Sequence, residues 1–217
     1  MGLTTPTACG DPLLSATASA SPLFVLDGYV QPFPVDLSSP RVSVVWVDPQ
    51  LGSVPDVAAA PDTLGFTIDA EGAFRLQLFS PPPPTAGAAS LSNGANAQFA
   101  WGEIVLYDDV AGVGSPPIGP GNQLAAPDTY RGATPDSVLI YIDSMETNGT
   151  TALWPILSDP AGYHLGMVGC NTFSTPVIEN SPNADGVDAI VTLQVVAPTS
   201  QLPYLRTCLQ SHPLTGS

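Results

Sequence analysis

Proline and glycine interrupt the apolar sequence of this chain so often that long helices have no room to form. The 217 residues include 25 prolines and 20 glycines, and most of these stand between short apolar runs. Proline ends helices because it lacks a backbone N–H and its ring clashes with the preceding turn, while glycine favours turns. The pattern therefore predicts an all-β fold of short strands joined by turns and loops.

Eight short runs have the composition of strands. The run RVSVVWVD at 41–48 is β-branched or apolar almost throughout, which predicts a central strand covered on both faces. Gly102 lies inside another run and indicates a bulge. Segments 80–97 and 110–136 are too rich in Gly and Pro for regular structure. We expect an antiparallel β-sandwich of about eight strands with long Pro/Gly-rich loops. The expected strands are 23–31, 41–48, 63–69, 72–79, 98–109, 137–143, 162–169 and 189–197.

The clearest hairpin is expected where two of these runs flank the sequence DAEG. Asp69 and Gly72 suit a tight turn, because aspartate bonds nearby backbone amides and glycine adopts positive φ without steric cost. Successive side chains of a strand point to opposite faces, so one face of the second arm is apolar and the other is largely solvated. The side chains on the apolar face are Phe74, Leu76 and Leu78.

Three segments between residues 28 and 78 carry a family resemblance. GYV at 28–30, RVSVVWVD at 41–48 and FTIDAEGAFRLQL at 66–78 are similar to strands of the transthyretin-like and carboxypeptidase-regulatory β-sandwiches. The resemblance implies an accessory β-sandwich without catalytic activity. The positions that match the hairpin pattern of these families are Thr67, Asp69, Gly72, Phe74 and Leu76.

The charge of the chain excludes several classes of partner and chemistry. It carries 19 acidic residues, four arginines and no lysine, for a formal net charge of −15. Nucleic acids and anionic lipids need cations that neutralise phosphate, so we expect neither as a partner. The absence of lysine also removes Schiff-base chemistry and the phosphate-binding lysine of P-loops.

The first 22 residues differ in composition from the rest. Residues 1–22 read as a low-complexity head or tether, and 23–217 as a single β-sandwich domain. No cationic n-region and apolar h-region precede Cys9, so we expect no intact secretory signal in this sequence. TACGD at 7–11 nevertheless resembles the cleavage site of bacterial lipoproteins, which makes Cys9 a candidate for lipidation. The alternative is an ordinary surface cysteine.

The other two cysteines lie in the strand-rich part of the chain. With no CxxC pair present, the simplest arrangement is a disulfide between Cys170 and Cys208. The alternative is three reduced thiols, because sequence alone does not fix the redox state.

Two acidic segments are candidates for cation binding. In NADGVDA, Asn183, Asp185 and Asp188 would converge around a glycine, and the alternative is a turn that these residue types favour without an ion. In DDVAGVG a calcium loop would need acids at the positions of alanine and valine. We therefore interpret the segment that begins at Asp108 and Asp109 as a turn.

Catalytic or redox-metal chemistry finds little support in the sequence. His164, Met167 and Cys170 are metal-ligand types, but their order is the reverse of that in blue-copper loops, and Met167 fits better in the core. Asp108 and Asp109 are adjacent on one strand and point to opposite faces, which does not suit a glycosidase pair. Neither G-x-S-x-G nor H-E-x-x-H occurs. We expect no catalytic residues and no cofactor.

These observations favour an exported, non-enzymatic β-sandwich that acts as a surface binding or structural module of the cell envelope or extracellular space. The chain as a whole resembles envelope lipoproteins of the myxobacterial type. Its expected partner is a protein or a surface polymer, with membrane contact only through a lipid anchor at Cys9. Exposed edge strands without lysine also favour self-assembly by strand addition. The alternative is a metal-dependent or carbohydrate-directed domain, a hydrolase or sugar binder, with its site in the long loops.

Overall fold

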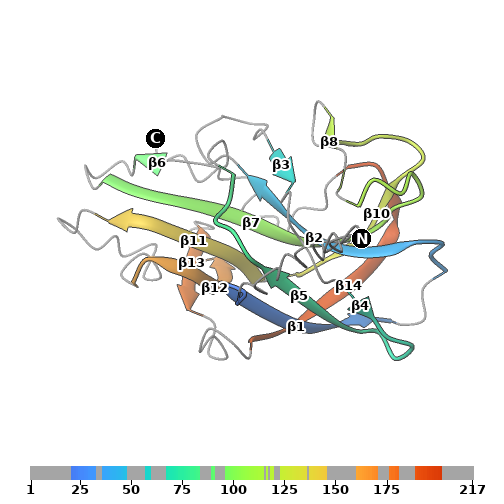
Figure 1. Cartoon of the computed structure of the whole chain (residues 1–217), viewed down its shortest axis with the longest axis horizontal. Coiled ribbons are helices and arrows are strands. Elements are labelled where there is room, and N and C mark those ends of the chain that lie inside the picture. Colours follow the sequence, from blue (N-terminus) through green and yellow to red (C-terminus); the bar gives the residue numbers. More distant parts are fainter. Residues whose placement is uncertain are drawn as a thin grey trace, which may run out of the picture.

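The computed structural model is built entirely of strands and connecting segments in the part of the chain that it describes (Figure 1). No helix long and apolar enough to cross a membrane occurs among the described residues. The all-β prediction is therefore confirmed for this part of the chain. The described residues are 21–32, 36–47, 57–59, 67–83, 89–90, 96–114, 116, 118–119, 123–135, 137–145, 160–170, 176–180 and 189–201.

Most of the strands join into one mixed sheet. Its path runs β13-β12-β11-β7-β10-β14-β1-β5-β4, while β2 pairs with β7 and β3, and β6 pairs with β7. The pairing of β1 with β14 is parallel, and the other described strand pairs are antiparallel. Strands β8 and β9 form a separate pair. The strands are β1 Phe24–Gln31, β2 Pro40–Val47, β3 Val57–Ala59, β4 Thr67–Ile68, β5 Ala73–Leu78, β6 Ala89–Ser90, β7 Asn96–Asp108, β8 Ile118–Gly119, β9 Gln123–Leu124, β10 Thr129–Ala133, β11 Ser137–Met145, β12 Gly162–Cys170, β13 Pro176–Asn180 and β14 Ala189–Thr199.

Strand β7 is the longest of the described strands and has strand partners along most of both edges. One edge pairs first with β11, through residues 97–102, and then with β10, through residues 105–108. The other edge pairs with β2 through residues 101–108 and with β6 at its start. Figure 1 shows β7 in green, running beside β11. The central part of β7 therefore has neighbours on both sides that can satisfy its backbone N–H and C=O groups.

The main core collects apolar side chains from strands that are far apart along the sheet path. Val42, Val44 and Trp46 of β2 belong to the same buried cluster as Phe74 of β5 and Leu26 of β1. Because β2 pairs with neither β1 nor β5, the sheet must bend to bring these side chains together. Strands β7, β11, β12 and β14 also contribute to this cluster.

A second, smaller core lies on the opposite face of β2 and β7. Val45 of β2 packs there with Val105 and Tyr107 of β7, Tyr130 of β10 and Leu124 of β9. Both faces of β2 are therefore buried. This confirms the part of the prediction, made from the β-branched run, that both faces of the strand are covered.

The hairpin around DAEG has the predicted form. Strands β4 and β5 pair with Thr67 opposite Arg75 and Ile68 opposite Phe74. Gly72 has φ of 85°, in the left-handed region that favours glycine. Its N–H donates to the Asp69 carbonyl at 3.1 Å and closes the turn. The alternation along β5 also holds, since Phe74, Leu76 and Leu78 are buried.

Two expectations for the Gly/Pro-rich regions were wrong. Segment 110–136 was expected to lack regular structure, yet it contains β8, β9 and β10. Strand β10 lies between β7 and β14 in the sheet, and its Tyr130 is fully buried. Segment 80–97 was also expected to be irregular, yet it contains β6 and the first residues of β7. Pairing with neighbouring strands has outweighed the weak local preference of these residues.

Gly102 does not mark a bulge, contrary to the expectation. Its pairing with β2 is continuous from Trp101 to Asp108, and the irregular registers lie instead at Tyr130/Gly132 and Ile142/Ser144. The glycine is required by close packing. A Cβ at this position would lie 2.4 Å from Val44 Cγ1 and 2.9 Å from Trp46 Cε3.

We predict that Gly102→Ala destabilises the fold by about 1–3 kcal/mol, the usual cost of overpacking a core. Val44→Ala removes the nearer contact at the cost of a small cavity. The free energies of unfolding of both single variants and the double variant, measured by chemical denaturation, should show a loss in the double variant smaller than the sum of the two. If the stability losses of the two single variants add up to that of the double variant, the close approach of Gly102 and Val44 is contradicted.

Candidate functional site

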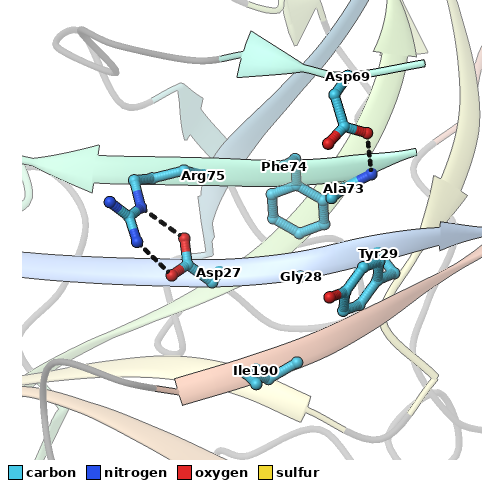
Figure 2. Close-up of a pocket in the computed structure, with 8 residues that line it drawn as sticks. All are labelled: Asp27, Gly28, Tyr29, Asp69, Ala73, Phe74, Arg75 and Ile190. Atoms are coloured by element: carbon cyan, nitrogen blue, oxygen red, sulfur yellow. Dashed lines mark hydrogen bonds and ion pairs between the residues drawn. The ribbon is translucent and has the colours of Figure 1, made fainter. Parts of the chain in front are cut away.

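An open pocket of about 310 Å³ lies on the outer face of the sheet where β1, β5 and β14 are neighbours (Figure 2). We call it the β1–β5–β14 pocket. It combines charged, aromatic and aliphatic side chains from three strands and one turn. Its lining residues are Asp27, Gly28, Tyr29, Asp69, Ala73, Phe74, Arg75 and Ile190.

Strand alternation and register bring these side chains to one face. In β1 the residues on either side of Asp27 and Tyr29 are buried, so these two side chains point outward. The antiparallel pairing with β5 sets Arg75 opposite Asp27. The parallel pairing with β14 sets Ile190 next to Asp27 on the other side. Three segments that are distant in sequence therefore meet at Asp27.

Arg75 and Asp27 form a two-pronged ion pair in the lining of the pocket. Arg75 donates from Nε to Oδ1 and from Nη2 to Oδ2 of Asp27, each at 2.7 Å. Their side chains are 58% and 32% exposed, so solvent screens much of the attraction. The hydrogen bonds from Arg75 hold the pKa of the Asp27 carboxyl below its usual value, against the opposing effect of partial burial. The pair fixes the orientation of a carboxylate that stays ionised.

Asp69 supplies a second carboxylate, at the rim of the pocket. Its Oδ1 accepts hydrogen bonds from the backbone N–H of Glu71 at 3.0 Å and of Ala73 at 2.8 Å. These bonds hold the side chain in the turn between β4 and β5, as Figure 2 shows for Ala73. The feature that makes the tight turn therefore also positions a carboxylate in the lining of the pocket, across β5 from Asp27.

Gly28 and Phe74 lie beneath the ion pair and belong to the main sheet. A Cβ at position 28 would come within 2.4 Å of Phe74 Cζ and 2.5 Å of the Val191 carbonyl oxygen. The Phe74 ring, which is 3% exposed, therefore occupies the space above Gly28 on the core side. This packing holds β1 against β5 and keeps the pocket's strands in register.

Two large apolar side chains of the pocket remain exposed. Tyr29 is 48% exposed and Ile190 is 55% exposed, on neighbouring strands. Figure 2 shows Tyr29 on β1, on the other side of Gly28 from Asp27, and Ile190 on β14. An amphipathic ring next to oriented polar groups is the usual make-up of a recognition site.

Several residues predicted from the sequence lie outside the described part of the chain. They include the lipidation candidate Cys9 and one member of the expected disulfide, Cys208. Its partner Cys170 ends β12, and its side chain is not described. The cation-site candidates outside the described residues are Asn183, Asp185 and Asp188.

His164 and Met167 of β12 do not come together as a metal site. The His164 Nε2 atom lies 2.7 Å from the Pro160 carbonyl oxygen. Met167 is 38% exposed, so the expectation that it packs in the core was wrong. It pairs with Ser137 of β11 on one edge and Glu179 of β13 on the other, so strand pairing alone does not bury its side chain. No group of three or more His, Cys, Asp or Glu side chains suited to a metal occurs among the described residues.

The DDVAGVG segment forms a turn, as predicted. Both oxygens of Asp109 accept backbone hydrogen bonds, from Val113 and Gly114 at 2.9 Å each, and Arg41 Nε lies 3.2 Å from Oδ2. Asp108 points elsewhere and accepts hydrogen bonds from the backbone N–H of Ser39 at 2.7 Å and from Ser38. The two carboxylates therefore anchor different loops, consistent with the prediction that they do not act as a pair.

No family model, curated protein or solved structure matches this chain. The chemistry of the pocket follows from its own residues. Asp27 and Asp69 accept hydrogen bonds, Arg75 balances the charge of Asp27, and Tyr29 with Ile190 offers apolar surface. This pocket was not predicted from the sequence. The alternation along residues 23–31 does indicate that Tyr29 points outward. The alignment of Asp27 with Ile190 depends on pairing between segments distant in sequence, so no local pattern indicates it.

We predict that Arg75→Gln raises the pKa of Asp27, because the lost hydrogen bonds lowered it and the remaining burial raises it. A lowered folded-state pKa stabilises the protein above the unfolded pKa, and this small contribution is lost as pH falls through the folded value. Carbon-detected NMR titration of the carboxyl measures the shift. Arg131→Gln is the control, since Arg131 donates to the Asp36 carbonyl instead. Identical Asp27 titration in wild type and Arg75→Gln would refute the assignment.

Proposed function

We propose that this protein is a non-enzymatic module of the cell envelope or extracellular space that binds a surface partner through the β1–β5–β14 pocket. The observation that carries the proposal is the exposure of Tyr29 and Ile190 around an oriented ion pair. Apolar surface provides binding energy, while a carboxylate held in one position fixes the orientation of the bound ligand. Aromatic residues such as tyrosine are also enriched among the residues that dominate binding.

The overall charge supports a partner that is not strongly anionic. The chain has a formal net charge of −15, and in the pocket one arginine stands against two aspartates. Polyanions would be repelled over the whole surface. The proposed partner is therefore a surface polymer or protein without a high density of negative charge.

We propose further that the mixed sheet closes into a sandwich that presents the pocket on its outer face. The shared core of β2 with β1 and β5 supports this arrangement, because strands on opposite sides of a sandwich bury their side chains in one layer. Export, a disulfide between Cys170 and Cys208 and a lipid anchor at Cys9 remain proposals that rest on the sequence. In this scheme residues 1–22 tether the domain and leave the pocket accessible.

Co-sedimentation with isolated bacterial cell envelopes tests the proposed function. We predict that Tyr29→Ala weakens binding about tenfold, which corresponds to about 1.4 kcal/mol for the loss of an aromatic anchor. Val113→Ala is the control, since Val113 is 60% exposed on the loop after β7 and does not line the pocket. Both variants should have the same midpoint denaturant concentration of unfolding as the wild type. The proposal fails if the wild type does not bind, or if Tyr29→Ala binds as tightly as the wild type.

A further inference from the structure

We propose that the β1–β5–β14 pocket binds a neutral sugar unit of a surface glycan, with Tyr29 as the stacking platform and Asp27 and Asp69 as acceptors for sugar hydroxyl groups. This inference rests on the proposed function and names the ligand class for the same pocket. Four observations lead to it: the balance of charge, the hydrogen-bonding capacity, the exposed ring and the character of the neighbouring surface.

The charge balance of the pocket disfavours anionic ligands. An anion would meet Asp27 and Asp69, while the guanidinium of Arg75 is already bound to Asp27. Because Arg75 binds both oxygens of Asp27, this pair is close to neutral as a unit and leaves the single charge of Asp69. A neutral ligand with many polar groups meets no repulsion from that charge.

The polar groups of the pocket suit hydroxyls. A carboxylate has about four acceptor positions, and Asp27 uses one on each oxygen for Arg75. Asp69 uses Oδ1 for the two turn amides. Hydroxyl groups donate and accept, so sugar hydroxyls can donate to these oriented oxygens and accept from neighbouring donors. Arg75 acts as a positioning residue, because it holds Asp27 in place and keeps it ionised.

The apolar part of the pocket suits the C–H face of a sugar ring. Tyr29 is 48% exposed, and the adjacent Ile190 is 55% exposed. A pyranose ring presents an apolar C–H face and a hydroxyl rim, which matches an amphipathic ring beside carboxylates. The volume of about 310 Å³ lies near the lower end of the range for ligand pockets, so it suits one or two sugar units.

The surface beside the pocket is polar and uncharged, which favours a longer glycan. The parallel register sets Tyr29 next to Thr192 and Gln31 next to Gln194. All four side chains are exposed, and alternation places them on the same face as Asp27 and Ile190. Threonine and glutamine offer hydroxyl and amide groups without charge. A neutral chain that occupies the pocket can therefore continue along the β1–β14 pair.

Affinity electrophoresis in gels that contain a single polysaccharide tests the inference. The probes are four neutral polysaccharides (cellulose derivative, amylose, xylan and galactomannan) and the polyanion polygalacturonate. We expect at least one neutral polysaccharide to retard the wild-type protein, and polygalacturonate to retard it at least tenfold less. Tyr29→Ala should weaken binding to the neutral polysaccharide at least tenfold, and Gln194→Ala severalfold.

Val113→Ala is the control, since Val113 is 60% exposed on the loop after β7 and does not line the pocket. Circular dichroism and denaturant unfolding verify that each variant folds. If no neutral polysaccharide retards the wild type while Tyr29→Ala still loses envelope binding, the sugar inference is wrong and the proposed function stands. If Tyr29→Ala binds a neutral polysaccharide as well as the wild type does, the pocket is not the sugar site. If the wild type binds neither envelopes nor polysaccharides, both proposals fail.

Discussion

Strand β7 is the constraint on which the rest of the described structure depends. Its central residues have strand neighbours on both edges and packed side chains on both faces. Ile104 and Leu106 enter the main core, while Val105 and Tyr107 enter the second core, and all four are fully buried. A strand covered in every direction has one admissible register, because a slip of one residue would exchange the two cores. The registers of the strands that pair with β7 are therefore fixed as well.

The register of the strands that form the pocket depends on β7 through a series of strand pairings. Strand β10 pairs with β7, β14 pairs with β10, and β1 pairs with β14 in parallel. Each pairing inherits its register from the one before, so the alignment of Asp27 with Ile190 traces back to β7. Rigid strands hold the binding groups close to the geometry a ligand needs, which lowers the entropy cost of binding. The ion pair between Arg75 and Asp27 then fixes the one long charged side chain of the pocket.

Local patterns in the sequence predicted the parts of the fold that local physics decides. The β-branched run of β2 and the turn at Asp69 and Gly72 were found because burial on two faces and positive φ each leave a mark on adjacent residues. Strand β10 was missed, because a short segment beside Gly and Pro becomes a strand only when β7 and β14 pair with it. The pocket was missed for the same reason. Its residues look ordinary until a parallel pairing between distant segments places Tyr29, Asp27 and Ile190 together.

Native-state hydrogen exchange followed by NMR tests the role of β7 most directly. In a strand paired on both edges every successive amide is bonded to one neighbour or the other, whereas alternate amides of an edge strand face solvent. We predict that the consecutive amides from Val105 to Tyr107, which pair with β2 on one edge and β10 on the other, are all strongly protected and exchange among the slowest in the protein. An alternating pattern of fast and slow exchange along these residues would show that one edge of β7 is open in solution, and would contradict the account.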